Sequence, residues 1–169
     1  MSSQTPYQVL CVCLGNICRS PTAEVVFRHM CDEQKLPVLV DSAGTSNYHP
    51  GKAPDVRSQK HAKKRGYDLS NLRARQLTTQ DFLNFDLILA MDHENLADIQ
   101  TLAKVAQKQF NYIRAEIALM SEHDTQYSRQ AVPDPYYGGD DGFEQMLDQC
   151  ESSSCAWVRV LSQKLLSAV

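Results

Sequence analysis

The feature that most limits the fold is the alternation of short apolar runs with segments of helical spacing. The apolar, strand-like runs cover residues 7–13, 38–40, 85–91 and 113–120. Segments with hydrophobic residues at helical spacing follow them, at 23–30, 56–64, 92–105 and 143–166. This order predicts an α/β fold, with a parallel sheet, helices on both faces and right-handed crossovers. We expect Pro21 at the first position of the first helix, with Ser20 as its N-cap.

The size and charge of the chain limit its class. Its 169 residues, 43% of them hydrophobic, predict a single domain over residues 1–169 with a buried core. The net charge of −3 argues against a nucleic-acid partner, which needs a broad basic surface, so the basic residues between 60 and 75 are expected on a solvated helix face. No apolar stretch approaches the ~20 residues that cross a bilayer, and no basic residue precedes the first apolar run. We therefore expect neither a membrane partner nor a secretory signal.

The use of cysteine indicates a reducing compartment. The six cysteines are unevenly spaced, and a domain of this size does not need disulfides, so we expect reduced thiols and a cytoplasmic location. A zinc site is not expected, because no CxxC pair is present and because Cys11 and Cys13 are expected on opposite faces of their strand. Four cysteines are expected in the core: Cys11, Cys31, Cys150 and Cys155.

The stretch CLGNICRSP, residues 13–21, joins the first apolar run to the first helix. In a parallel sheet it lies at the carboxyl ends of the strands, where such folds bind ligands. Successive backbone amides and a helix N-terminus can bind an anion there, and Gly15 allows backbone angles that other residues resist. Arg19 adds a planar fork of donors suited to phosphate oxygens, and the same positive field favours the thiolate of Cys13. The loop therefore predicts a phosphate site with a nucleophile beneath the phosphorus atom.

A cysteine and an arginine separated by five residues are a weak signal alone, but the full string resembles the phosphate-binding signature of the low-molecular-weight protein tyrosine phosphatase family. Other segments resemble family segments in the family's order: VDSAGTS at 40–46, ARQLT at 74–78, DLILAMD at 86–92 and DPYYGGDDGFE at 134–144. The resemblance covers nearly the whole chain. It implies a three-layer, flavodoxin-like fold with four parallel strands in the order 2-1-3-4. It also implies an enzyme that hydrolyses phosphotyrosine and small aryl phosphates without a cofactor or metal.

The resemblance implies roles for individual residues. Cys13 is the nucleophile that forms a phosphocysteine, Arg19 is the phosphate clamp, and Asp134 is the general acid and base. The remaining loop residues are expected to bind the phosphoryl group: Leu14, Gly15, Asn16, Ile17, Cys18 and Ser20.

Supporting roles follow from the same resemblance. Ser20 is expected to hydrogen-bond the thiolate sulfur. Asn16 is expected to hold the shape of the loop, with Ser42 orienting it. Asp92 is expected to support Arg19 and also to begin the next helix.

Three tyrosines are candidates for the entrance of the pocket. Tyr48, Tyr136 and Tyr137 could stack on the phenyl ring of a phosphotyrosine, or they could only pack the loops. Tyr136 and Tyr137 are also plausible targets of a partner tyrosine kinase. We expect a monomer or a weak dimer that acts on phosphotyrosine proteins.

One position departs from the family pattern. The family usually carries a histidine that helps to orient the loop asparagine, and Leu72 stands at that place here. We predict that Ser42 and Ser20 hold Asn16, with Asn71 or water as a substitute for the missing histidine.

Cys18 has two interpretations. By resemblance, it can form a reversible disulfide with Cys13 that protects the nucleophile from irreversible oxidation. Alternatively, it is a small buried hydrophobic residue.

Two other functions fit parts of the sequence less well. A thiol-dependent arsenate reductase shares this fold and loop, but it needs further cysteines in a mid-chain segment, and this chain has none between residues 32 and 149. A catalytically silent phosphotyrosine-binding module is disfavoured because Cys13, Arg19 and Asp134 are all present.

Overall fold

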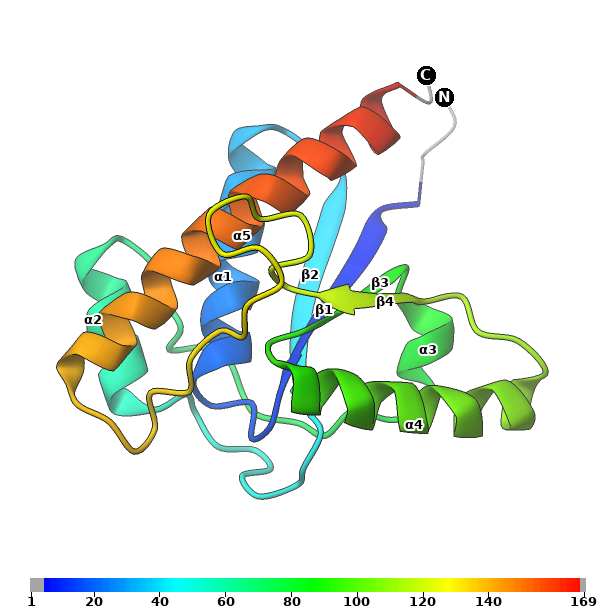
Figure 1. Ribbon diagram of the computed structural model, residues 1–169, viewed down its shortest axis with the longest axis horizontal. Helices are drawn as coiled ribbons and strands as arrows, with labels where there is room; N and C mark the ends of the chain where they lie inside the picture. The colour runs from blue at the N-terminus through cyan, green and yellow to red at the C-terminus, as the bar shows by residue number, and fades with distance from the viewer. Residues whose placement is uncertain (1–4, 168–169) are drawn as a thin grey trace.

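The computed structural model describes residues 5–167. Four parallel strands form one sheet in the order β2-β1-β3-β4. The strands are β1 (Tyr7–Cys13), β2 (Val38–Gly44), β3 (Leu87–Ala90) and β4 (Glu116–Leu119). The helices are α1 (Arg19–Glu33), α2 (Val56–Lys64), α3 (Asp81–Asn84), α4 (His93–Phe110) and α5 (Asp140–Leu166). The predicted fold class and strand order are confirmed (Figure 1).

Helices cover both faces of the sheet and bury two apolar clusters. α1, α2 and α5 pack over one face, while α3 and α4 pack over the other (Figure 1). The central strand β1 supplies both clusters, because Val9, Cys11 and Cys13 face α1 and α5 whereas Leu10 and Val12 face the other way. The expectation that Cys11 and Cys13 face opposite sides is therefore wrong, since residues two apart on a strand share a face.

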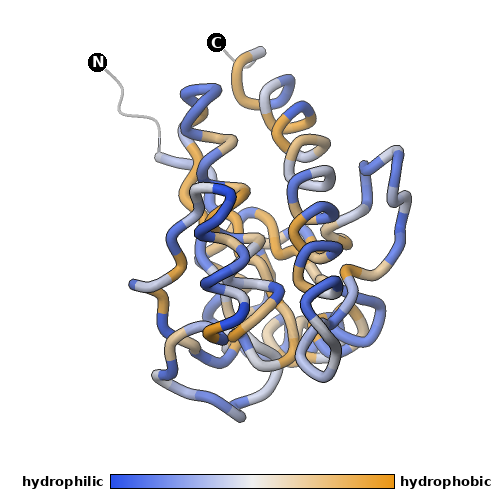
Figure 2. The backbone as a smooth tube through the Cα atoms, turned by 90° about the vertical axis from the view of Figure 1, so that its left-hand side faces the viewer, coloured by the Kyte–Doolittle hydropathy of each residue, from blue (hydrophilic) through white to orange (hydrophobic). Residues whose placement is uncertain are grey.

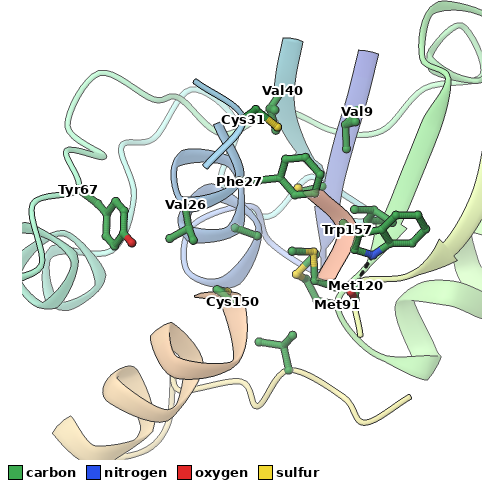
Figure 3. Close-up of a cluster of buried hydrophobic side chains, with 14 of the residues drawn as sticks. Val9, Val26, Phe27, Cys31, Val40, Tyr67, Met91, Met120, Cys150 and Trp157 are labelled. Carbon is green, nitrogen blue, oxygen red and sulfur yellow. Dashed lines mark hydrogen bonds between the residues drawn. The ribbon is translucent and has the colours of Figure 1, made fainter. Parts of the chain in front are cut away.

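The larger cluster lies between the sheet, α1 and α5 and is shown in Figure 3. Phe27 is fully buried there, and burying a side chain of this size contributes about 1.5–3 kcal/mol. Trp157 lies in the same cluster, and its indole nitrogen donates to the Met120 carbonyl over 2.8 Å (Figure 3). Figure 2 colours the chain by hydropathy, and it shows hydrophobic segments inside and hydrophilic segments outside.

The start of α1 differs from the prediction. The helix begins at Arg19 with Cys18 as N-cap, so Pro21 occupies the third helical position rather than the first. Proline is tolerated there, because the first amides of a helix have no partner within the helix. Ser20 is not the N-cap, because its hydroxyl points to the sulfur of Cys13.

Other boundaries follow the prediction with local differences. α2 has the predicted bounds, and Gly66, at a φ of 90°, ends it as expected while the amide of Tyr67 closes back onto the Ala62 carbonyl over 3.0 Å. α4 continues to Phe110 and ends at Asn111, which has a φ of 66°. β4 is shorter than residues 113–120, and α5 begins before residue 143, at Asp140.

A short helix lies directly before residues 85–91, the predicted third strand. α3 was not expected, and Phe85 ends it, so β3 starts only at Leu87. The carboxylate of Asp81 accepts the amide of Thr78 over 2.8 Å, which stabilises this turn. This side-chain contact is local, but it leaves no periodic pattern of hydrophobic residues from which the helix could be predicted.

Two surface expectations need correction. Cys155 is exposed on α5, whereas Cys11, Cys31 and Cys150 are buried as predicted. The basic segment is not all solvated, because Arg65 pairs with acids of α5 and Arg75 pairs with Asp81 over 3.0 Å. Over residues 5–167, no helix is both long and apolar enough to cross a membrane.

Candidate active site

The phosphate loop, residues 13–19, lies at the carboxyl edge of the sheet, between β1 and α1. The end of β2 holds it in place: the amide of Thr45 donates to the Cys13 carbonyl over 2.9 Å, and that of Ser46 donates to the Leu14 carbonyl over 3.0 Å. A Cβ atom at Gly44 would lie only 2.6 Å from the Leu14 oxygen. This close approach requires glycine, a requirement that the sequence analysis missed.

Two polar groups lie beside the sulfur of Cys13, a residue that is 3% exposed. The backbone amide of Asn16 donates to Sγ over 3.3 Å, and the hydroxyl of Ser20 lies 3.1 Å from Sγ. Asn16 reaches this position with a φ of 58°, in the left-handed region that asparagine tolerates better than most residues. The loop is therefore shaped to stabilise negative charge at this sulfur.

Asn16 is fully hydrogen-bonded behind the loop. Its side-chain nitrogen donates to Ser20 Oγ over 2.8 Å and to Ser42 Oγ over 2.9 Å. Its side-chain oxygen accepts the backbone amide of Arg75 over 3.0 Å. Ser42 in turn donates to Glu24 Oε1 over 2.7 Å. The contacts predicted from Ser20 and Ser42 are thus present.

The partner expected to replace the missing histidine is different. Asn71 is exposed and is not a hydrogen-bond partner of Asn16, so that part of the prediction is wrong. The side-chain oxygen of Asn16 accepts the backbone amide of Arg75 instead. Leu72 packs against the apolar cluster beneath α1 and α5.

Glu24 is a buried carboxylate that the sequence analysis did not identify. Burial raises its pKa, although hydrogen bonds from Ser42 and Arg28 oppose the shift. Arg28 also donates to the Val40 carbonyl over 2.7 Å. The network thus links α1 and β2 to Asn16, and its only sequence signal is an acidic residue on an otherwise apolar helix face.

Arg19 joins the phosphate loop to two other segments. Its guanidinium lies 2.6 Å from Asp92 Oδ2, donates to the Val132 carbonyl over 3.3 Å and lies 3.5 Å from Asp134 Oδ2. Burial alone would lower its pKa, but the charges of Cys13, Asp92 and Asp134 raise it above its ordinary value. Asp92 also accepts the amide of Asn95 over 2.6 Å as the N-cap of α4, so both predicted roles of Asp92 have their contacts.

Asp134 lies on the loop before α5, residues 131–139, called here the acid loop. Its side chain is 43% exposed, and Oδ1 accepts the amide of Tyr136 over 3.1 Å. The other oxygen faces Arg19, so the carboxyl lies beside the site where a phosphoryl group would bind.

One pocket brings the predicted residues together. Cys13, Arg19 and Asp134 line it with these neighbours: Leu14, Gly15, Ile17, Cys18, Tyr48, His49, Tyr136 and Tyr137. Asn16 and Ser20 do not line it. They lie beneath the loop and are 3% and 0% exposed.

His49 is the pocket residue that the sequence analysis missed. A Cβ built on Gly15 would lie 3.1 Å from the imidazole, so His49 covers the loop glycine. Its ring also lies 6.4 Å from that of Tyr136. A single histidine in a loop rich in glycine and proline carries no pattern that predicts this position.

Four buried cysteines have raised pKa values. Burial raises the pKa of Cys18, Cys31 and Cys150 to about 12, and raises that of Cys11 as well. These groups stay as thiols, and only Cys18 among them lines the pocket. Within residues 5–167, no group of three or more His, Cys, Asp or Glu side chains is arranged to hold a metal ion.

A parallel α/β sheet with a thiol and an arginine in one loop at its carboxyl edge, and a carboxyl beside them, defines a cysteine-dependent phosphatase. Residues 8–167 match the family model described as "Low molecular weight phosphotyrosine protein phosphatase". The chain belongs to this family of enzymes.

Relatives and solved structures agree with this assignment. The human low molecular weight phosphotyrosine protein phosphatase is 43% identical over 152 residues, which are 89% of this chain and 92% of that protein. A protein tyrosine phosphatase structure from Entamoeba histolytica, with Hepes in its active site, superposes with a TM-score of 0.83 at 36% identity, covering 94% of this chain and 98% of that one. A Drosophila arginine phosphatase structure reaches a TM-score of 0.83 at 31% identity, covering 90% of this chain and 96% of that one.

Proposed function

We propose that the chain hydrolyses phosphotyrosine in proteins with Cys13 as nucleophile, Arg19 as phosphate clamp and Asp134 as general acid and base. The observation that carries this proposal is the convergence of all three side chains on one pocket. They come from β1, α1 and the acid loop.

In the first step, the Cys13 thiolate attacks phosphorus and forms a sulfur–phosphorus bond while the bond to the phenolic oxygen breaks. Asp134 gives its proton to that oxygen, so tyrosine leaves as a neutral phenol. Arg19 and the loop amides bind the equatorial oxygens, where charge is concentrated in the transition state.

In the second step, water attacks the phosphocysteine. Asp134, now a carboxylate, accepts a proton from the water as the new oxygen–phosphorus bond forms. The sulfur–phosphorus bond breaks and returns the Cys13 thiolate, and inorganic phosphate is released. The amide of Asn16 and the hydroxyl of Ser20 lie within hydrogen-bond reach of this leaving sulfur.

The depth of the sulfur supports phosphotyrosine as the substrate. Cys13 is 3% exposed, so the phosphoryl group must reach it on a long arm. Tyr48 and Tyr137, which are 69% and 94% exposed, stand at the rim with Tyr136, where they can stack on a phenyl ring. Because one structural neighbour is named an arginine phosphatase, phosphoarginine is the comparison substrate: kcat/KM for a phosphotyrosine peptide is expected to exceed that for its phosphoarginine counterpart.

The first test is hydrolysis of para-nitrophenyl phosphate. Wild type is expected to be active, and Cys13→Ser to lose at least about 10⁴-fold in kcat. Asp134→Ala should lower kcat less for para-nitrophenyl phosphate than for phenyl phosphate, because the nitrophenol leaving group needs less protonation. Equal rates for wild type and Cys13→Ser would end the proposal, and reduction of arsenate by wild type would favour the reductase alternative.

We propose a protective disulfide between Cys13 and Cys18 as well. A peroxide would oxidise the Cys13 thiolate to a sulfenic acid, and the Cys18 thiol would then displace water to form the disulfide. Because burial raises the pKa of Cys18 to about 12, the second step is expected to be slow. Mass spectrometry after mild peroxide treatment should find the link, while a lasting sulfonic acid at Cys13 with a free Cys18 would contradict it.

We also propose a cellular location and interaction partners for this protein. Six unpaired cysteines support a reducing location such as the cytoplasm. Tyr137 is exposed enough for a tyrosine kinase to reach, and Tyr136 is the neighbouring candidate. We expect a monomer or weak dimer, and partners from a lysate should be retained by the Asp134→Ala variant but not when Arg19 is also removed.

A further inference from the structure

The first turn of α2 touches both loops of the active site. The amide of Asp55, the N-cap of α2, donates to the Ile17 carbonyl of the phosphate loop over 2.8 Å. Two residues later, the guanidinium of Arg57 donates to the Tyr136 carbonyl of the acid loop over 2.9 Å. In the fold, α2 lies beside the first turns of α5, directly after the acid loop (Figure 1).

The guanidinium of Arg57, whose side chain is 42% exposed, is paired with Asp55. Its Nε lies 3.1 Å from Asp55 Oδ1 and its Nη2 lies 3.0 Å from Oδ2, so the carboxylate holds the fork at two points. Its central carbon lies 4.8 Å from the ring centre of Phe143 and 5.6 Å from that of Tyr136. A lysine could not reproduce this planar arrangement.

The contact continues to the general acid through one residue. Tyr136 has its carbonyl held by Arg57, while its amide donates to Asp134 Oδ1 over 3.1 Å. The side chain of Asp134 is 43% exposed, and among the hydrogen bonds and ion pairs of residues 5–167 its carboxyl contacts only Arg19 and Tyr136. The position of its carboxyl therefore depends on where the backbone at Tyr136 is held.

We propose that Asp55 and Arg57 are positioning residues that hold the carboxyl of Asp134 at a fixed position relative to the phosphate loop. The proposal rests on the function proposed above. Its alternative is that Arg57 only fastens α2 to α5 and contributes to stability without any effect on proton transfer. The proposal and its alternative differ in one measurable respect. If Arg57 positions the acid, the fall in kcat/KM on replacing Arg57 depends on the leaving group of the substrate, and otherwise it does not.

The test compares kcat/KM for para-nitrophenyl phosphate and phenyl phosphate in wild type and Arg57→Ala. Phenol resembles tyrosine, with a pKa of about 10, and needs the proton that the more acidic nitrophenol can forgo. We expect the loss in Arg57→Ala to be about 10-fold larger for phenyl phosphate, because a displaced acid protonates poorly. Arg57→Lys should behave like Arg57→Ala, since it keeps the charge but loses the fork.

A double-mutant cycle separates this effect from a general structural one. In an Asp134→Ala background, Arg57→Ala should change the rate on phenyl phosphate by less than about 2-fold, because the group it positions is already absent. Arg159→Ala, at an exposed arginine of α5, is the matched control and should leave both rates unchanged. Asp55→Asn keeps an N-cap acceptor and weakens only the fork, so it is the second variant if Arg57→Ala does not fold.

Two outcomes would overturn the inference: an equal loss on both substrates in Arg57→Ala, or an undiminished loss when Asp134 is already alanine. Neither would touch the proposed function, which fails only if wild type does not hydrolyse aryl phosphates or if Cys13→Ser retains its activity.

Discussion

The phosphate loop and the acid loop form one pocket but are held in opposite ways. In the phosphate loop, Cys13 and Asn16 are each 3% exposed, and the side chain of Asn16 bonds to Ser20, directly after the loop, and to Ser42 of β2. In the acid loop, Tyr137 is 94% exposed and Asp134 is 43% exposed. This second loop is held at Val132, which is buried, and at the Tyr136 carbonyl, which accepts from Arg57, while Asp134 and Tyr137 stay open to solvent.

This difference in burial between the two loops fits the chemical role of each loop in the proposed reaction. Groups that stabilise charge in a transition state act best when they are fixed before the substrate arrives. A general acid must lie near the leaving oxygen yet leave room for the substrate to enter and the product to depart. The buried loop therefore suits the thiolate, and the open loop suits the proton donor.

The largest of these effects is expected at Arg19, which lies in the phosphate loop and contacts Asp134 of the acid loop. Arg19→Lys keeps the charge but loses the planar fork that faces Asp92 and Asp134 and that would bind the phosphoryl oxygens in the proposed reaction. We expect kcat/KM for para-nitrophenyl phosphate to fall by about 10²–10³-fold. Arg73→Lys, at an exposed arginine that donates only to nearby carbonyls, is the control. A loss below about 3-fold in Arg19→Lys would mean that charge alone is sufficient.

A matched pair of glycines tests the difference in rigidity. In Gly44→Ala the new Cβ would lie 2.6 Å from the Leu14 oxygen, so the phosphate loop must shift, and we expect kcat/KM to fall by about 10²-fold. In Gly138→Ala, in the acid loop, the nearest atom is the Pro135 oxygen at 3.7 Å, so little should change. Circular dichroism would check that both variants fold. Equal effects of the two substitutions on kcat/KM would break the comparison.

A smaller effect is expected where the segment leading to the acid loop is anchored. Asp124 accepts the amides of Gln126 and Tyr127 and the hydroxyls of Ser152 and Ser153 on α5. Burial alone would raise its pKa, but these hydrogen bonds lower it below the ordinary value. Asp124→Asn should cost about 1–3 kcal/mol of stability at neutral pH.

The sign of the pH dependence follows from the lowered pKa of Asp124. The ionised carboxylate stabilises the fold above its unfolded pKa of about 3.9, and this contribution is lost as pH falls through that value toward the folded pKa. Urea unfolding from pH 7 to pH 3 should therefore show the gap between wild type and Asp124→Asn closing in acid. Asp98→Asn, at an exposed acid on α4, is the control. A gap that stays constant would argue against this role.

The smallest effect is expected from restoring the family's histidine. Asn16 already accepts the amide of Arg75 over 3.0 Å, so Leu72→His adds no missing partner to the phosphate loop. It also places a polar ring where Leu72 packs against the apolar cluster. We expect kcat to change by less than about 3-fold and the melting temperature to fall slightly. A clear rise in kcat would show that the loop asparagine is poorly held in this chain.

The chain order alone was sufficient to predict the layers of this protein. Alternating apolar runs determine which segments are strands, and the handedness of crossovers limits how those strands can join. Two of the errors have a local cause: the turn that forms α3 and the inward hydroxyl of Ser20 depend on single side chains rather than on a period.

The sequence by itself also determined the candidate nucleophile and clamp, because Cys13 and Arg19 lie in one short loop whose ends are fixed by β1 and α1. Only the tertiary structure decided what surrounds them. The Arg75 amide on Asn16, the imidazole of His49 over Gly15 and the hold of Arg57 on Tyr136 join residues that lie far apart in the chain. Such contacts depend on the path of each loop after the core has packed, and no local pattern of residue types encodes that path.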